Sequence, residues 1–319
     1  MILALLEITL GILFLTWSAD KLVAGSSSLA KHLKIAPLII GLTIVALGTC
    51  MPEVVVSIIA SLNHNSEIAI GNAVGSNITN IGLVLGLCAL IHPLSIETVT
   101  IRKEIPILAV VTIIATLLLW FVGLNVLSSS LMLLGAIAFI YWLVDRGRKQ
   151  RRNDEFIEGL APNLSIKMSI FWIIVGLLVL VSSAKALIEG AVYLAHYFEI
   201  PELVIGLTLV AVGTSLPELA ASLIATLKKE YGIAVGNVIG SNIFNLTLVL
   251  SAPGFVTPNQ PITNRVFLTD LPVMVLMTMI LVFLGFKKDN QDKIGRYSGA
   301  LFLVIYVVYI GFMAVEQMV

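Results

Sequence analysis

The chain has 319 residues, 58% of them hydrophobic and 12% charged, and its formal net charge is zero. Soluble domains carry about 25% charged residues, so this composition excludes a surface that is mostly in water and predicts one covered by membrane lipid. The basic residues form short clusters without interleaved aromatic residues, which argues against nucleic acid as a partner. Cys50 and Cys88 lie inside apolar stretches and predict neither a disulfide framework nor a zinc site.

Ten apolar segments are long enough to cross a membrane, which takes about 20 residues of α-helix. In chain order the expected spans are 3–30, 35–62, 68–92, 104–122, 126–144, 168–196, 200–227, 232–252, 267–286 and 297–316. No basic region precedes the first span, and more apolar chain follows it, which favours a membrane helix over a cleaved signal peptide. The expected fold is an all-α integral membrane protein with ten transmembrane helices.

The longest polar break divides the spans into two sets of five. It predicts a first five-helix repeat over 1–144, a linker over 145–167 and a second repeat over 168–319. Lys and Arg gather in this linker and in the loops on its side, and short loops rich in positive charge stay in the cytoplasm. The loops of the opposite side carry only Arg265. We therefore expect a multi-pass protein of the cell (inner) membrane with both termini outside and the linker in the cytoplasm.

A shift of 165 residues aligns the two halves. Residues 35–85 and 200–250 match without a gap, and more than half of these positions are identical. Because five is an odd number, the second copy must enter the membrane from the opposite face. Such inverted repeats are typical of transporters, which hold their substrate near the midplane where the repeats meet.

Each copy carries a polar cluster around a proline and a glutamate: Gly48-Thr49-Cys50-Met51-Pro52-Glu53 and Gly213-Thr214-Ser215-Leu216-Pro217-Glu218. Proline lacks an N–H and clashes with the carbonyl four residues back, so we expect loosened helices and free carbonyl oxygens near Gly48 and Gly213. An acid at the centre of a span costs about 2.5–3.5 kcal/mol, so Glu53 and Glu218 need a partner. A cation bound between the two carboxylates explains their equivalent positions. The alternative is pairing with the charged residues of the first spans of each repeat, Asp20, Lys21, Lys185 and Glu189.

A second polar cluster follows in each copy, at 71–80 and 236–245. Ser76 and Asn80, like Ser241 and Asn245, are four residues apart and share one helix face. The glycines of these clusters are also explained by ordinary close packing of membrane helices. Together with the glutamates, these side chains form an all-oxygen ligand set, which suits calcium with its six to eight oxygen ligands and also suits sodium. Neither a nucleophile with a base nor a phosphate-binding loop occurs, so we expect neither an enzyme nor a cofactor.

The motifs G-T-x-x-P-E and G-N-x-x-G-S-N, each present twice, resemble those of the cation/calcium antiporter superfamily, especially prokaryotic sodium/calcium exchangers. The resemblance covers nearly the whole chain and implies that Glu53 and Glu218 are the central calcium ligands. Further oxygens would complete the calcium and sodium sites, from Thr49, Ser76, Thr214, Ser215 and Ser241, with the carbonyls of Ala46 and Ala211 at outer sodium sites. It also implies that spans 3–30 and 168–196 slide across the other eight. We expect Gly25 and Gly190, at equivalent points of these two spans, to provide a smooth surface for that movement.

Two positions depart from the family pattern. Cys50 stands where the second copy has Ser215, although the family uses a backbone oxygen at this place too. Asn245 stands where many sodium/calcium exchangers carry aspartate, so the site matches Asn80 with Asn245 and has only two strong negative charges.

The sequence thus predicts a secondary active antiporter that exchanges calcium for sodium by alternating access at a midplane site. The alternatives are a proton/calcium antiporter, because such proteins also work with a glutamate pair, and a cation channel or another solute carrier. The expected partners are membrane lipid and the transported cations, with no obligatory protein partner.

Overall fold

The computed structural model describes residues 1–95, 98–149, 162–198, 211–286 and 293–316. Nine helices of this described part are long and apolar enough to cross a membrane. They are Ile2–Leu33, Pro37–Leu62, Ser66–Ile91, Lys103–Phe121, Val126–Gly147, Ile166–Tyr197, Tyr231–Val256, Val266–Gly285 and Arg296–Glu316. The tenth predicted span, 200–227, is described only from residue 211, and its earlier part lies outside the described residues.

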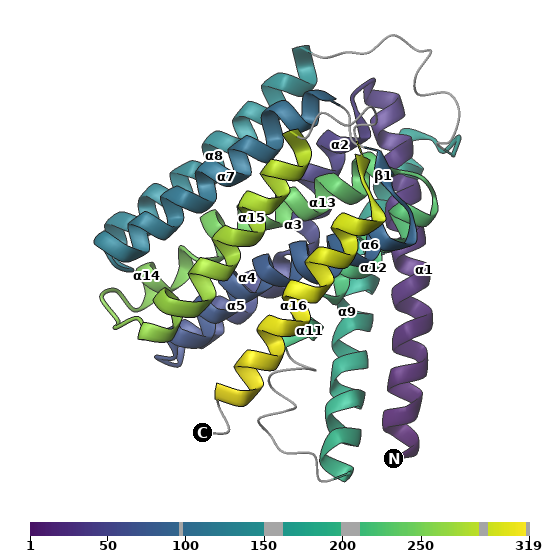
Figure 1. Ribbon diagram of the computed structural model, residues 1–319. Helices are drawn as coiled ribbons and strands as arrows, with labels where there is room; N and C mark the ends of the chain where they lie inside the picture. The colour runs from purple at the N-terminus through teal and green to yellow at the C-terminus, as the bar shows by residue number, and fades with distance from the viewer. Residues whose placement is uncertain (96–97, 150–161, 199–210, 287–292, 317–319) are drawn as a thin grey trace.

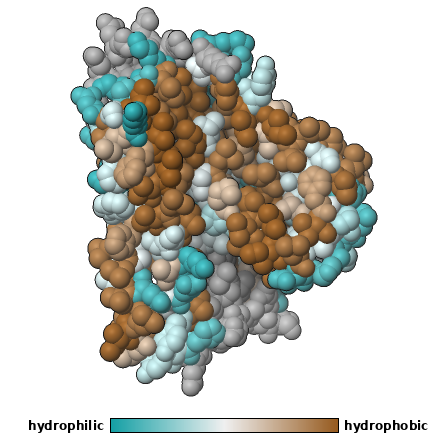
Figure 2. Space-filling model, turned by 180° about the vertical axis from the view of Figure 1, so that it is seen from behind, coloured by the Kyte–Doolittle hydropathy of each residue, from teal (hydrophilic) through white to brown (hydrophobic). Residues whose placement is uncertain are grey.

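The surface of these helices is strongly apolar. Figure 2 shows a broad hydrophobic area over one face of the molecule, with hydrophilic residues gathered mainly above and below it. Many large apolar side chains are exposed on the long helices, among them Leu13, Phe121, Leu134, Leu178, Phe283 and Val307. Lipid is the environment in which such a surface is stable, so the chain is a multi-pass integral membrane protein.

The second and third spans are broken helices. The second runs through α2 (Pro37–Ile40), the π-helical η1 (Gly41–Val45), α3 (Ala46–Thr49) and α4 (Met51–Leu62). The third runs through α5 (Ser66–Thr79), the π-helical η2 (Asn80–Leu85) and α6 (Gly86–Ile91). The interruption at Cys50 comes two residues before Pro52, which has no N–H for the ladder.

Where it is described, the second half repeats these breaks at equivalent residues. It contains α11 (Ala211–Thr214), α12 (Leu216–Leu227), α13 (Tyr231–Phe244), the π-helical η5 (Asn245–Val249) and α14 (Ala252–Val256). The bounds of α12 and α13 are those of α4 and α5 shifted by 165 residues. Over the residues described in both halves, the matched sequences therefore give matched local structure, with a break before each proline and a π-helical segment that begins at Asn80 and at Asn245. The equivalent of η1 lies outside the described residues.

The remaining spans are α7 (Thr98–Phe121), α8 (Val126–Lys149), the π-helical η6 (Val266–Asp270) with α15 (Leu271–Phe286), and α16 (Arg296–Glu316). Glu104 of α7 and Arg146 of α8 form a buried ion pair. The described chain is not purely helical, since β1 (Leu94–Ser95) and β2 (Lys293–Ile294) form a short antiparallel pair. In Figure 1 the first residues of α1 and the last turn of α16 lie at the same end of the molecule.

Two long helices, α1 (Ile2–Leu33) and α9 (Ile166–Tyr197), stand side by side at one edge of the molecule (Figure 1). They run antiparallel, since Gly25 packs against Ser169 and Gly190 packs against Ala4. A Cβ added at Gly25 would lie 2.8 Å from the Ser169 carbonyl oxygen, and one added at Gly190 would lie 2.8 Å from that of Ala4.

The prediction that Gly25 and Gly190 form the surface that slides past the other helices is therefore wrong, because both lie at the contact between α1 and α9. The nearest neighbours of Gly25 lie on α9, and those of Gly190 lie on α1. The close approach of helix backbones requires small residues at the crossing, and this requirement is what places glycine there. A different pair of glycines, Gly48 and Gly213, faces α9. A Cβ at Gly48 would meet the Leu177 side chain, and one at Gly213 would meet that of Ile188.

Candidate cation site

The two glutamates of the proline motifs hold equivalent places. Glu53 lies in the first turn of α4 and Glu218 in the first turn of α12, and both side chains are fully buried. The positive end of a helix dipole stabilises a carboxylate in the first turn. Each helix start is thus a place where a buried negative charge is tolerated.

An asparagine holds each glutamate segment against the next span. The Asn72 side-chain amide donates to the Glu53 carbonyl oxygen at 3.0 Å and to the Ser57 hydroxyl at 3.1 Å. The equivalent Asn237 donates to the Glu218 carbonyl oxygen at 3.3 Å and to Ser222 at 2.9 Å. The two copies therefore fix α4 on α5 and α12 on α13 in the same way.

Contacts between the two halves bring the glutamates together. The Thr49 hydroxyl donates to the Asn237 side-chain oxygen at 3.1 Å, and the Cys50 thiol donates to the Ser241 carbonyl oxygen at 3.7 Å. Thr49 and Cys50 also lie beside the carboxyl group of Glu218, which is close enough to Glu53 for their charges to interact. The site lies where the halves meet.

Several buried polar atoms, on the segments that carry these glutamates or pack against them, have no hydrogen-bond partner among the described residues. They include both carboxylate oxygens of each glutamate and side-chain atoms of four neutral residues: Asn80, Ser215, Ser241 and Asn245. Buried polar groups in proteins are normally paired, and leaving them unpaired is costly. In the described part of the chain, no group of three or more His, Cys, Asp or Glu side chains is placed to hold a metal ion. The groups available to a cation between these glutamates are two carboxylates and neutral oxygens.

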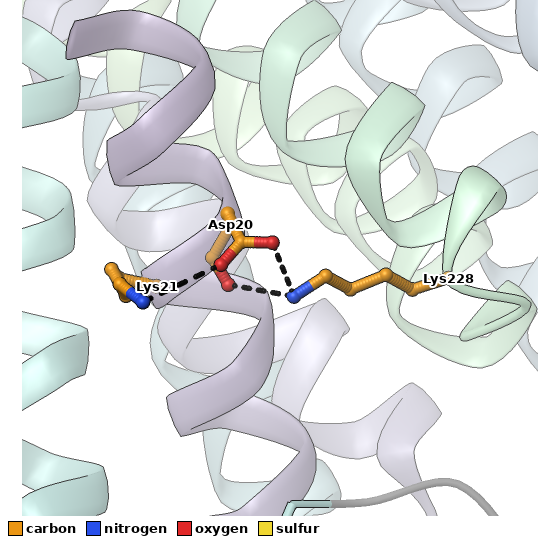
Figure 3. A network of polar contacts seen from close by, with 3 residues as sticks. All are labelled: Asp20, Lys21 and Lys228. Carbon is orange, nitrogen blue, oxygen red and sulfur yellow. Dashed lines mark hydrogen bonds and ion pairs between the residues drawn. The ribbon is translucent and has the colours of Figure 1, made fainter.

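The charged residues of the first spans do not neutralise these glutamates. Lys228 Nζ lies 2.6 Å from Asp20 Oδ1 and donates to the Asp20 carbonyl oxygen at 3.2 Å, while Lys21 lies 3.8 Å from the other Asp20 oxygen (Figure 3). Lys185 pairs with Glu189 on its own helix at 3.7 Å. The alternative of a Glu–Lys pairing at the centre therefore does not hold.

A cavity of about 320 Å³ adjoins the site. Ser76 and Thr214, both predicted ligands, line it together with Gly71 and Gly75. A Cβ added at either glycine would meet no atom within 4 Å. The glycines at the equivalent places of the second half are packed, since a Cβ at Gly236 would lie 2.6 Å from the Leu38 carbonyl oxygen. The two halves thus hold matched motifs in unequal surroundings.

The other predicted ligands lie at the breaks of the spans. Asn80 and Asn245 are buried at the first residues of η2 and η5, and Ser215 is buried between α11 and α12. The Ala46 carbonyl oxygen accepts from the Cys50 N–H at 3.0 Å and from the Thr49 hydroxyl at 3.3 Å. Ala211 begins α11, where its backbone is described.

Asn72 and Asn237 were not among the predicted ligands, and the structure gives them a positioning role. A signal was present in the sequence, because each follows its glutamate by 19 residues in both copies. That regularity does not reveal which atoms the amide contacts. Their bonds to a carbonyl oxygen and a hydroxyl become visible only once the spans are packed.

Comparisons with known proteins agree with this architecture. The model of the family described as "Sodium/calcium exchanger protein" matches residues 3–144 and 168–315. The inner membrane protein YrbG of Escherichia coli (strain K12) is 36% identical, covering 97% of this chain and 96% of its own. The sodium/calcium exchanger MaX1 of Methanosarcina acetivorans is 32% identical, over 96% and 97% of the two chains.

Solved structures of the sodium-calcium exchanger NCX_Mj are also similar. One of them, soaked with Na⁺ and Sr²⁺, has 34% sequence identity and a TM-score of 0.85, covering 97% of this chain and 98% of its own. The family model covers most of the chain, and the solved structure matches it nearly end to end. The chain therefore belongs to the sodium/calcium exchanger family, and it is a membrane-spanning cation/calcium antiporter.

Proposed function

We propose that the protein exchanges calcium against sodium at the site between Glu53 and Glu218. The observation that carries the proposal is the pair of fully buried carboxylates at the contact of the two halves, surrounded by neutral oxygen atoms without partners. Two carboxylates balance the charge of one Ca²⁺, and calcium accepts six to eight oxygens in flexible geometry. Sodium ions can occupy parts of the same oxygen set, so the two cations would compete for it.

The remaining ligands are assigned around this pair. Oxygens of Thr49, Ser76, Thr214, Ser215 and Ser241 would complete the calcium and sodium positions, with Cys50, Asn80 and Asn245 at the edge of the same shell. The carbonyls of Ala46 and Ala211 would serve outer sodium positions. The Ala46 oxygen keeps lone-pair capacity beside its two bonds.

We infer that residues 1–144 and 168–319 are inverted repeats joined by the linker 145–167, and that transport proceeds by alternating access. Antiparallel packing of the equivalent helices α1 and α9 supports the inversion. The division is supported by the two segments matched by the family model, 3–144 and 168–315. In this scheme the α1–α9 pair moves as one unit across the other spans.

We propose that both termini are outside and the linker is in the cytoplasm of a cell (inner) membrane. The distribution of Lys and Arg supports this orientation, and the bacterial relative YrbG is named an inner membrane protein. With this orientation the cavity beside Ser76, which is also lined by Arg265 and Met313, lies on the outer side. The described state would therefore be open to the outside.

The proposal is tested by calcium uptake into proteoliposomes. Vesicles loaded with sodium are diluted into sodium-free medium with calcium, and uptake is compared with a pH jump at matched membrane potential. We expect uptake to follow the sodium gradient. Uptake that follows only the pH jump would assign proton coupling, and uptake without any countergradient would point to a channel.

Asn245→Asp is expected to change the coupling to the monovalent cation. The substitution adds a third negative charge at the start of η5, where Asn245 is fully buried. A third carboxylate attracts monovalent cations or protons into the site, so the sodium or pH dependence of calcium uptake should steepen. Asn77→Asp is the matched control, because Asn77 lies on the neighbouring α5 and is not among the assigned ligands. Unchanged sodium and pH dependence in Asn245→Asp would exclude this residue from the shell.

Lys228→Asn is expected to shift the protein away from the described access state. The Lys228–Asp20 pair joins α1 to the end of α12 (Figure 3), and the equivalent positions of the other half hold Asn63 and Lys185, which cannot form such a pair. A partly exposed pair contributes about 0.2–1 kcal/mol, so the population ratio should change by at most about fivefold.

The shift is measured by labelling Gly75→Cys, in the cavity, with an impermeant thiol reagent added outside. Labelling should be slower when Lys228→Asn is added. Lys229→Asn is the control, because Lys229 has a φ of 63° that asparagine tolerates. Equal labelling of Gly75→Cys alone, with Lys228→Asn and with Lys229→Asn would show that the Lys228–Asp20 pair does not favour either access state.

A further inference from the structure

Asp270 is an acidic residue inside an apolar span that the proposed exchange does not use. It ends η6 within the span Val266–Gly285, and the residue is 5% exposed. It lines the same cavity as Ser76 and Thr214. An ionisable residue inside a membrane is costly and generally faces an ion path or a water-filled space. Its position therefore calls for a functional explanation.

The neighbours of Asp270 leave its negative charge available to the cavity. Tyr309 donates a hydrogen bond to its Oδ1 at 2.9 Å. Arg265 lies near enough for its charge to be felt, but its Nε lies 3.9 Å from a Glu316 oxygen and its Nη2 contacts Met313 Sδ at 3.0 Å. One arginine thus faces two carboxylates, those of Asp270 and Glu316, and its single positive charge cannot balance both of them when they are ionised.

The backbone at Asp270 has the same irregular form as the candidate ligand segments. Four π-helical segments occur among the described residues. Of the other three, η1 runs directly into Ala46, η2 begins with Asn80 and η5 begins with Asn245. Single π-helical turns inside α-helices are frequent at functional sites. The fourth, η6, ends on Asp270, which is the one acidic residue among the described residues that line the cavity.

We propose that Asp270, with Tyr309, forms an outer cation site in this cavity, where an entering Ca²⁺ or Na⁺ is held before it reaches Glu53 and Glu218. The cavity volume of about 320 Å³ has room for several waters, each taking about 30 Å³. The cation therefore keeps part of its hydration shell there. A single carboxylate in a narrow space concentrates cations and raises their rate of entry. This inference rests on the proposed function.

The first experiment separates capture of the cation from its translocation. Asp270→Asn keeps the shape of the side chain and its ability to accept from Tyr309, but it removes the charge. We expect the KM for calcium from the cavity side to rise by about three- to tenfold, with the maximal rate changed less than twofold and with a weaker dependence on ionic strength. Asp270→Glu should restore most of the wild-type KM.

Glu316→Gln is the matched control, because Glu316 pairs with the same arginine but does not line the cavity. Its KM should stay near the wild-type value. A wild-type KM in Asp270→Asn would overturn the proposal. An equal KM increase in Asp270→Asn and Glu316→Gln would also overturn it, because that result would reflect the overall charge around Arg265 and not a cation site at Asp270.

The second experiment needs no transport. Equilibrium binding of radioactive calcium is measured in detergent to the double variant Glu53→Gln with Glu218→Gln, and to the same protein with Asp270→Asn added. We expect a weak, millimolar calcium site in the double variant that is lost in the triple variant. Equal binding by the two proteins would overturn the outer site while leaving the proposed exchange intact. Failure of the wild-type protein to move calcium against sodium would instead overturn the exchange and leave this comparison valid.

Discussion

Glu53→Gln and Glu218→Gln are each expected to abolish calcium transport while the protein still inserts and folds. Either substitution leaves a doubly charged ion facing one buried carboxylate. An uncompensated buried charge costs about 3–5 kcal/mol, which corresponds to a loss of affinity of two to four orders of magnitude. The measurements are calcium uptake into proteoliposomes and equilibrium calcium binding in detergent.

Folding of these variants is checked by thermal unfolding without calcium. Removing one of two buried carboxylates that interact relieves their repulsion, so the unfolding temperature without calcium should be unchanged or higher. The stabilisation by added calcium should disappear. Glu67→Gln, an exposed acid in the first turn of α5, is the control and should transport normally. Wild-type calcium affinity in either central variant would exclude the site between the halves.

Gly25→Leu is expected to destabilise the protein severely and to reduce the amount of folded material. Even a single Cβ at this position would lie 2.8 Å from the Ser169 carbonyl oxygen and 3.2 Å from Ile173 Cγ1. Overpacking of a buried contact typically costs about 1–3 kcal/mol, and the contact here is with backbone, which cannot move aside. The unfolding temperature in detergent and the folded fraction by size-exclusion chromatography measure the effect.

Gly311→Leu serves as the comparison for Gly25→Leu. Gly311 also lies within a helix, but a Cβ there would meet no atom within 4 Å. Its replacement should leave the unfolding temperature unchanged or slightly raised, since leucine favours helix more than glycine does. A Gly25→Leu protein as stable as Gly311→Leu, with slow turnover, would restore the view that Gly25 faces the sliding surface.

The sequence was a reliable guide to the spans and to the family. Apolar length placed nine spans within a few residues of the helices observed in the described part of the chain. The 165-residue repeat anticipated that α12 and α13 would begin and end at the places equivalent to α4 and α5. These features follow from local composition and from matching one stretch against another, which need no knowledge of packing.

Packing is what the sequence could not supply. Which helix Gly25 contacts depends on how α1 and α9 cross, and these two helices are more than 100 residues apart in the chain. The sequence around Gly25 would be the same whichever helix it contacted. The contact of Thr49 with Asn237 joins the two halves, so neither repeat taken alone predicts it. Asp270 falls within a segment that the sequence predicts to be an apolar span, because one acid hardly changes the mean hydropathy of 20 residues. Its role emerges only when the cavity is known.

The length of α1 and α9 connects the protein to the bilayer around it. Each has 32 residues, so each is about 48 Å long, whereas the hydrocarbon core of a membrane is about 30 Å thick. The first turns of α1 expose large apolar side chains, including Ile2, Leu3 and Leu6, which also need lipid. Helices longer than the core tilt or deform the bilayer, at a cost that depends on its thickness. In the proposed alternating access, movement of this pair would change that mismatch. Acyl-chain length would then contribute to the free-energy difference between the two access states, and the thickness of the membrane would influence ion exchange.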